Sequence, residues 1–150
     1  MTLRETDPPN PDFAETTRRF LTEMPISQHF GFAVTGVGPG LFEITQPFRK
    51  ELSFRPGIFQ AGPVGTLADM AAACAGMTML PRGWRTSTVD YTIKLIAPAA
   101  GDMIVARGRV VRSGRTLSVT ASDVYAVRDG KEALCATALA TIRNFETSGS

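Results

Sequence analysis

The stretch Ile58–Leu80, IFQAGPVGTLADMAAACAGMTML, contains one charged residue, Asp69, and consists mostly of Ala, Gly, Met and Leu. A run of this length and composition predicts a helix that is buried on nearly every side. A buried carboxylate costs free energy unless it is paired or hydrogen-bonded, so proteins seldom keep one for structural reasons alone. Asp69 is therefore a candidate functional residue. The alternative is a structural Asp that bonds to neighbouring Ser, Thr or backbone groups.

The same stretch is long enough to cross a bilayer. However, Pro63 and Gly65 lie near its start and alanine dominates it. Asp69 at its centre would also cost roughly 2.5–3.5 kcal/mol on membrane-insertion scales. We therefore expect a core helix and no membrane association.

After residue 83 the apolar period changes from helical to two. In residues 88–98, TVDYTIKLIAP, strict alternation places Val89 and Tyr91 on one face of a strand and Thr88 on the other. Three more strand patterns follow, GDMIVARGRVVR, TLSVTASDVYAV and EALCATALATIRNF. The pair Asp129-Gly130, just before the last of them, is a strong hairpin signal. These patterns predict four long antiparallel strands.

The N-terminal half is less regular. Residues 10–24 predict a short amphipathic helix capped by Asn10, and residues 30–48 predict two strands joined at residues 38–40, followed by a connecting loop. The whole order predicts one α+β domain over residues 1–150, an antiparallel sheet with its helix on one face, with residues 1–9 and 146–150 flexible. Small helix residues would let the sheet curve closely around the helix: Ala61, Gly62, Gly65, Ala68, Ala72 and Gly76.

Composition excludes several functional classes. The net charge is only +2, and the 16 basic residues are spread evenly, so nucleic-acid binding is not expected. Cys74 and Cys135 lie in apolar stretches and are interpreted as buried free thiols in a reducing compartment. His29 is the single histidine, and no His/Cys cluster offers a metal site. The N-terminus has no apolar core typical of a signal peptide, which favours a cytoplasmic protein.

Four sequence blocks in the same order resemble one known group of enzymes. The blocks are GPVGTLADMAAACAG, TVDYTIKLIAPAAGD, GRVVRSGRTL and DGKEALCATALATI, within residues 30–145. They resemble the hotdog-fold acyl-CoA thioesterases of the phenylacetic-acid-degradation (PaaI-like) type. The resemblance implies an antiparallel sheet wrapped around one long central apolar helix. It also implies hydrolysis of an acyl-CoA thioester with no cofactor besides the coenzyme A of the substrate.

The resemblance assigns candidate catalytic residues. In that family His-Gly-Gly precedes the helix, and a catalytic Asp or Glu follows nine residues after the histidine. These positions fall on Gln60-Ala61-Gly62 and on Asp69. The backbone amide that polarises the carbonyl falls on Ala61, and a hydroxyl that assists the carboxylate falls on Thr88. This chain departs from the family pattern at Gln60, and at Phe54, where relatives often place Asn or Gln.

The chemistry suits these residues. Free amides at Ala61 and Gly62, at the positive end of the helix dipole, would stabilise an oxyanion. Asp69 would act as general base on water or as nucleophile. Ala61 and Asp69 are eight residues apart, about 12 Å along a helix, so one helix cannot place both on the same carbon. Two antiparallel copies across a twofold axis could do so. The resemblance likewise implies a homodimer, and beyond it a dimer of dimers.

Substrate-binding candidates follow in part from the resemblance. Relatives place basic residues near the nucleotide, which here indicates Arg112, Gly114 and Arg115, with Arg82 as another candidate. The alternative is that these arginines are simply solvated. Further candidates for the acyl pocket are Phe54, Phe59 and Met70, which core packing explains equally well.

Two rival functions stay open at this point. One is a hydroxyacyl dehydratase of the same fold, which relies on a histidine with an acidic partner. His29 lies outside the helix region, which argues against it. The other is a non-catalytic acyl-CoA-binding protein, which the departures at Phe54 and Gln60 favour.

Overall fold

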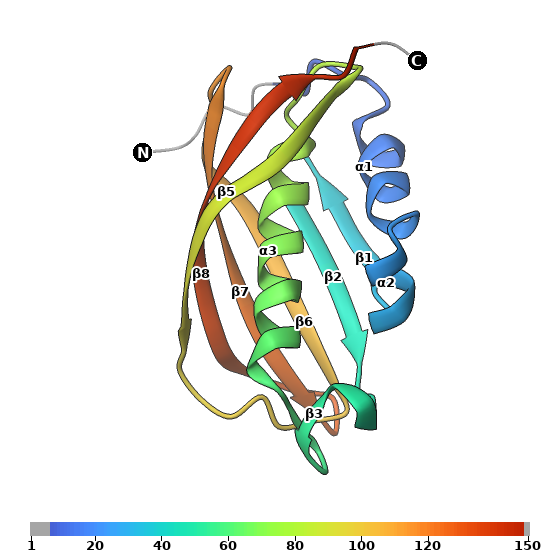
Figure 1. Ribbon diagram of the computed structural model, residues 1–150, viewed down its shortest axis with the longest axis vertical. Coiled ribbons are helices and arrows are strands. Elements are labelled where there is room, and N and C mark those ends of the chain that lie inside the picture. The colour runs from blue at the N-terminus through green and yellow to red at the C-terminus, as the bar shows by residue number, and fades with distance from the viewer. Residues whose placement is uncertain (1–6, 149–150) are drawn as a thin grey trace.

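A six-stranded antiparallel sheet wraps around one central helix in the computed structural model, which describes residues 7–148 (Figure 1). The helix is α3, Ala61–Met77, and the strand order across the sheet is β1-β2-β6-β7-β8-β5. The strands are β1 (Ala33–Gly38), β2 (Leu41–Pro47), β5 (Trp84–Leu95), β6 (Met103–Arg112), β7 (Leu117–Arg128) and β8 (Lys131–Glu146). This is the predicted α+β architecture.

Small residues bring the sheet into close contact with α3. A Cβ added at Gly108 of β6 would collide with the Ala71 carbonyl, and one added at Gly76 would collide with Ile142 of β8. Glycine is therefore required at residue 108, where the colliding atoms are backbone, whereas at residue 76 the end of the Ile142 side chain would have to shift. The predicted role of small helix residues is confirmed from Gly65 onward. It is wrong for the first two, Ala61 and Gly62, which are exposed.

Strand β5 departs from the predicted alternation. Thr88 pairs with Ile142 and Asp90 pairs with Thr141, which leaves Val89 as an extra residue in a β-bulge. Because Ile142 faces the helix, Thr88 faces it too, and Tyr91 faces it from beyond the bulge. The prediction that Thr88 lies on the opposite face from Tyr91 is therefore wrong. A bulge changes the phase of a strand by one residue, so both hydroxyl side chains reach the same side.

The N-terminal region forms two helices, α1 (Phe13–Thr22) and α2 (Pro25–Phe30), where the sequence predicts one. Asn10 is buried, and its side-chain oxygen accepts a hydrogen bond from the amide of Asp12 just before α1. Gly31 ends α2 in the left-handed conformation, with φ of 75°. His29, which directly precedes the strands predicted over residues 30–48, thus lies exposed in the last turn of a helix.

The predicted connecting loop before α3 is partly structured. It contains a 3-10 turn, η1 (Lys50–Leu52), and a small hairpin of β3 (Ser53–Arg55) and β4 (Ile58–Phe59). At the other end, β8 continues through Glu146, and the Thr147 amide donates a hydrogen bond to the Gly83 carbonyl. Part of each predicted flexible terminus, residues 1–6 and 149–150, lies outside the described residues.

Both cysteines are buried and free, as predicted. In the part of the chain that the structure describes, no helix is long and apolar enough to cross a membrane.

Candidate active site

Asp69 lies on the side of α3 that faces β5, and its carboxylate is held by one hydroxyl. The Thr88 Oγ1 donates a hydrogen bond of 2.7 Å to Asp69 Oδ1. Both side chains are half-buried, so the carboxylate is shielded from water without being sealed inside the core. The expected contact between these two residues is therefore present. It depends on the bulge at Val89, which turns Thr88 toward the helix.

Burial and the hydroxyl act in opposite directions on this carboxylate. Desolvation raises the pKa of Asp69 above its ordinary value, while the hydrogen bond from Thr88 lowers it, and burial has the larger effect. A carboxylate with a raised pKa is a stronger base than an exposed one. The site therefore contains a group suited to taking a proton.

The first turn of α3 presents one backbone amide without an acceptor. Gln60 is the N-cap residue, and its side-chain oxygen accepts a hydrogen bond from the amide of Gly62. Pro63 has no amide hydrogen, and the Val64 amide bonds to the Gln60 carbonyl. Among residues 7–148, no acceptor is found for the amide of Ala61.

This arrangement corrects the prediction for Gly62, whose amide is not free, because a glutamine at residue 60 can fold back as a cap. Gln60, a predicted site residue, thus acts as the N-cap of α3.

Tyr91 is a third polar group near Asp69, which the sequence analysis did not select. Its hydroxyl lies 3.4 Å from the position that a Cβ at Gly65 would occupy. Gly65 and Asp69 are four residues apart on α3 and so lie on one face, a turn from each other. The signal that could have identified Tyr91 is Gly65, since a glycine inside a helix often makes room for a neighbouring side chain.

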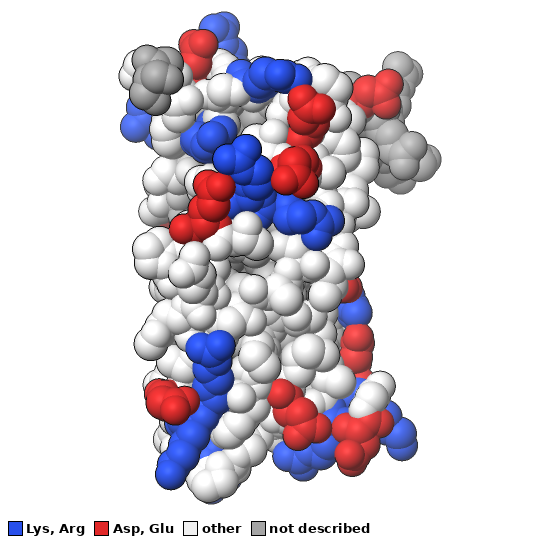
Figure 2. Space-filling model, turned by 90° about the vertical axis from the view of Figure 1, so that its right-hand side faces the viewer, with Lys and Arg blue, Asp and Glu red and all other residues white. Residues whose placement is uncertain are grey.

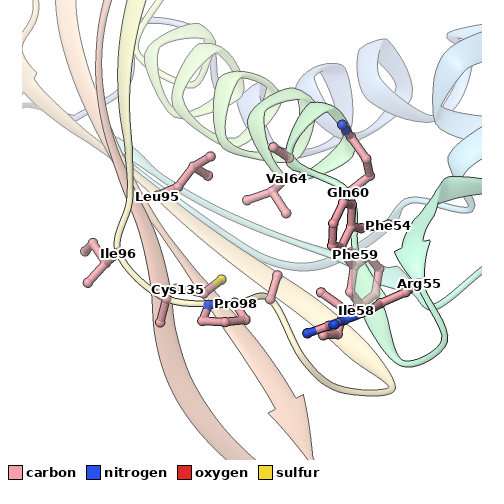
Figure 3. A pocket seen from close by; sticks show the side chains of 13 residues that line it. Phe54, Arg55, Ile58, Phe59, Gln60, Val64, Leu95, Ile96, Pro98 and Cys135 are labelled. Carbon is pink, nitrogen blue, oxygen red and sulfur yellow. The ribbon is translucent and has the colours of Figure 1, made fainter.

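A pocket of about 530 Å³ opens at the start of α3 (Figure 3). Val64 and Gln60 of the helix lie on one side of it, and Leu95, Pro98 and Cys135 lie opposite. Two of the predicted acyl-pocket residues, Phe54 and Phe59, line it. The third, Met70, does not line it and packs instead against the core cluster, because it lies more than two turns along α3 from Ala61 at the pocket.

Asp69 does not line this pocket, whereas Ala61 does. The free amide and the carboxylate therefore lie at two separate places along α3, as their spacing of eight residues predicts. Beside them runs β5, the last strand of the sheet, whose outer edge pairs with no other strand among residues 7–148.

The predicted nucleotide-binding residues lie at the opposite end of the molecule from the pocket. Arg112 and Arg115 are exposed around Gly114 in the turn between β6 and β7, and Arg82 forms an ion pair with Asp12. The neighbouring Arg107 is occupied on the outer face of the sheet, where it bonds to two glutamates at 2.6 and 2.7 Å. Arg112 and Arg115 make no ion pair among the described residues.

The face of the molecule that carries α1 has no continuous basic patch (Figure 2). On the face that carries α1, acidic and basic side chains are interspersed toward both ends and an uncharged band separates them (Figure 2). Within residues 7–148, no three side chains of His, Cys, Asp or Glu are grouped in a way that could hold a metal ion.

Comparisons with known proteins identify the family of the chain. A family model described as the thioesterase superfamily matches residues 61–133, which include α3, β5 and the pocket residue Leu95. No curated protein matches the chain.

Solved structures extend the similarity over nearly the whole chain. A thioesterase family protein from Silicibacter pomeroyi is 30% identical, with a TM-score of 0.87, over 90% of this chain and 99% of its own. A phenylacetic acid degradation-related protein from Ralstonia eutropha is 25% identical, with a TM-score of 0.71, over 85% and 98%. A Haemophilus influenzae thioesterase, 20% identical over 88% and 90% with a TM-score of 0.76, shares the fold. The chain therefore belongs to the thioesterase superfamily and has its hotdog fold.

Proposed function

We propose that this protein hydrolyses acyl-CoA thioesters to a free acid and CoA, at a site shared between two copies of the chain. The observation that carries the proposal is the Asp69–Thr88 pair, a half-buried carboxylate oriented by a hydroxyl and otherwise open to a reactant. A buried carboxylate kept in this way is expected where it performs chemistry.

The reaction needs a polarised carbonyl and an attacking oxygen. The Ala61 amide, at the positive end of α3, would donate to the carbonyl oxygen as it becomes an oxyanion. With Asp69 as general base, the water oxygen bonds to the thioester carbon while Asp69 takes its proton. The C–S bond then breaks and the leaving CoA thiolate takes that proton. With Asp69 as nucleophile, its carboxylate oxygen bonds to the thioester carbon, the C–S bond breaks and CoA leaves as a thiolate, which gives a mixed anhydride. Water then cleaves the anhydride to the free acid and Asp69, and a proton from that water neutralises the thiolate.

The two groups act on one carbon only if they come from different subunits. Along β5, Thr88 lies level with Asp69, because the two are hydrogen-bonded. Leu95 lies level with Ala61, because these two residues line the same pocket. An unprotected edge strand is a natural site for pairing with another chain. Antiparallel pairing of β5 with its copy, with Thr88 opposite the partner's Leu95, brings Asp69 level with the partner's Ala61. Val89 is an extra residue in the bulge and does not count in the pairing, so the midpoint between Thr88 and Leu95 is Thr92. The twofold axis of the dimer would pass near that residue.

The same pairing explains two other features. Exposed apolar side chains on β5 and its continuation, Val89, Leu95 and Ile96, are between 54% and 59% exposed in the single chain and would be covered. Arg112 and Arg115 lie at the end of the molecule opposite the pocket. In an antiparallel dimer they would come toward the partner's pocket end, where CoA phosphates need cations.

Complementation between two inactive variants tests the shared site. Ala61→Pro removes the free amide, and proline suits the first position of a helix, so α3 should still form. Asp69→Asn removes the carboxylate charge. Each variant alone should lose about a hundredfold or more in kcat/KM. Co-expressed, they should form mixed dimers with one intact site, which restores about a quarter of wild-type activity in a twofold dimer.

Three outcomes are distinct. Restored activity supports the shared site. Mixed dimers as inactive as the parents, beside an active wild type, would place the whole site within one chain. A wild type that binds acyl-CoAs but hydrolyses none of them would make this an acyl-CoA-binding protein.

A further inference from the structure

The pocket at the start of α3 contains one residue whose position is set by an irregularity of the sheet. We propose that this pocket binds the acyl group of the substrate and that this group is uncharged and apolar, an inference that rests on the proposed function. Cys135 then sets how large an acyl group fits. Ala61 lines the same pocket, so a thioester carbonyl that accepts a hydrogen bond from its amide would direct its acyl group into the cavity.

The lining decides the chemical class. The side chains of its buried residues consist of carbon and one sulfur: Phe59, Val64, Ala99 and Cys135. The exposed Leu95 and Pro98 add only apolar side chains to the lining. Two polar side chains, Arg55 and Gln60, line the exposed part, and the Gln60 oxygen already accepts from Gly62. A charged or hydroxylated acyl group would lose its hydration inside without gaining a partner. The volume of about 530 Å³ is within the range of small-molecule pockets.

Cys135 occupies a second β-bulge, in β8. Val124 pairs with Ala136 and Tyr125 pairs with Leu134, so Cys135 is the extra residue between them. Its carbonyl accepts hydrogen bonds from the amides of Ile96 at 2.8 Å and Ala97 at 3.3 Å, which attaches the wall segment after β5 to β8. Bulges of this kind re-aim a side chain. Figure 3 shows the Cys135 sulfur on the cavity side of the strand.

The thiol contributes volume and not reactivity. Cys135 is 1% exposed, and its sulfur donates a hydrogen bond of 3.3 Å to the Val124 carbonyl. Burial raises the pKa of Cys135 to about 11, so the thiolate needed for attack on a thioester is scarce near neutral pH. The side chain is thus a fixed, neutral part of the pocket wall.

Changing the volume at residue 135 should therefore change acyl preference. Cys135→Ala enlarges the cavity and Cys135→Met fills it. For acetyl- to dodecanoyl-CoA plus benzoyl-CoA, we expect Cys135→Met to lower kcat/KM for the largest accepted acyl groups about tenfold relative to the smallest. Cys135→Ala should shift preference toward larger groups. The matched control is Cys74→Ala, which deletes the same atom from a buried cysteine that does not line the pocket.

The outcomes separate this inference from the function on which it rests. An active enzyme whose acyl preference is the same in both Cys135 variants and in wild type would overturn the inference and leave thioester hydrolysis intact. Preference for glutaryl-CoA, which carries a carboxylate, over a neutral acyl group of equal length would overturn the apolar class. If wild type hydrolyses none of the panel, calorimetric affinities for the same acyl-CoAs decide. If the affinities of the Cys135 variants change with acyl size and those of Cys74→Ala do not, the result supports this pocket as the acyl site. If the affinities of the Cys135 variants do not change with acyl size, the inference is overturned.

Discussion

The two sides of α3 use small residues for opposite purposes. On the side toward β6 and β7, Gly108 allows the sheet to lie directly against the Ala71 carbonyl, and Ser122 donates a 2.8 Å hydrogen bond to the Ala68 carbonyl. On the side toward β5, Gly65 leaves space for the Tyr91 hydroxyl, one turn from Asp69. The first side is sealed and the second is half-open. The difference suggests that the first side determines stability and the second determines activity.

The strongest test of this division is Asp69→Asn. We expect kcat/KM for acyl-CoA hydrolysis to fall about a hundredfold or more, because the base or nucleophile is lost. Stability should not fall with it. Burial raises the pKa of Asp69 in the folded state, so ionisation of this group opposes folding, and stability declines as pH rises through the interval between the unfolded and folded pKa values. Removing the charge relieves that cost at neutral pH.

The check is urea unfolding of both proteins at pH 7 beside steady-state thiol release. A variant that loses activity because it is less stable would show that Asp69 is a structural group.

Gly108→Ala tests the sealed side. Its Cβ would collide with backbone atoms of α3, so we expect a loss of about 1–3 kcal/mol in the free energy of unfolding. Gly38→Ala is the matched control, since a Cβ there meets only ordinary contacts with Leu41 at 3.8 Å. Denaturant titration of both variants measures the difference. Equal stabilities would show that the helix can move away from β6 at little cost.

Thr88→Val tests the balance of forces on the carboxylate. The hydroxyl lowers the pKa of Asp69, so its removal should raise that pKa further. Because either role of Asp69 needs the charged form, the acid limb of the kcat/KM profile should move to higher pH. Pre-steady-state or steady-state rates between pH 4 and 9 provide the measurement. A profile that only falls in height, without moving, would mean that Thr88 does not act through the ionisation of Asp69.

Tyr91→Phe should have the smallest effect. If its hydroxyl bonds to the substrate or to an attacking water, losing one neutral hydrogen bond should lower kcat/KM by about threefold to tenfold. The ring and its packing over Gly65 remain, so unfolding and dimer formation serve as controls and should not change. Unaltered kinetics would limit the polar part of the site to Asp69 and Thr88.

Much of the fold follows from local pattern. The apolar run at Ile58–Leu80, whose single charge is Asp69, indicates α3. Period-two patterns with Asp129-Gly130 indicate the C-terminal strands, and the structure contains all of these elements. Helix α2 was missed because six residues are too few to show a helical period. The bulge at Val89 was missed because a phase change depends on pairing with β8, which local alternation does not contain.

Some features of the candidate site also follow from the sequence, and others do not. Asp69 stands out as a lone charge in an apolar helix, and the family spacing identifies Thr88 beside it. The Gln60 side chain accepts from the Gly62 amide and leaves the Ala61 amide without an acceptor in the first turn of α3. This outcome depends on one side-chain rotamer, which the sequence does not specify. That Cys135 faces a pocket depends on the register of two strands far apart from α3 in the chain.

The open amide at the start of α3 has a consequence for mutational tolerance. It belongs to the backbone, so every residue type except proline supplies it at position 61. Related proteins that differ at this position would have no side chain in common there, and would share only the absence of proline. A comparison of sequences that looks for common functional groups would rank Ala61 among the least informative residues of the chain.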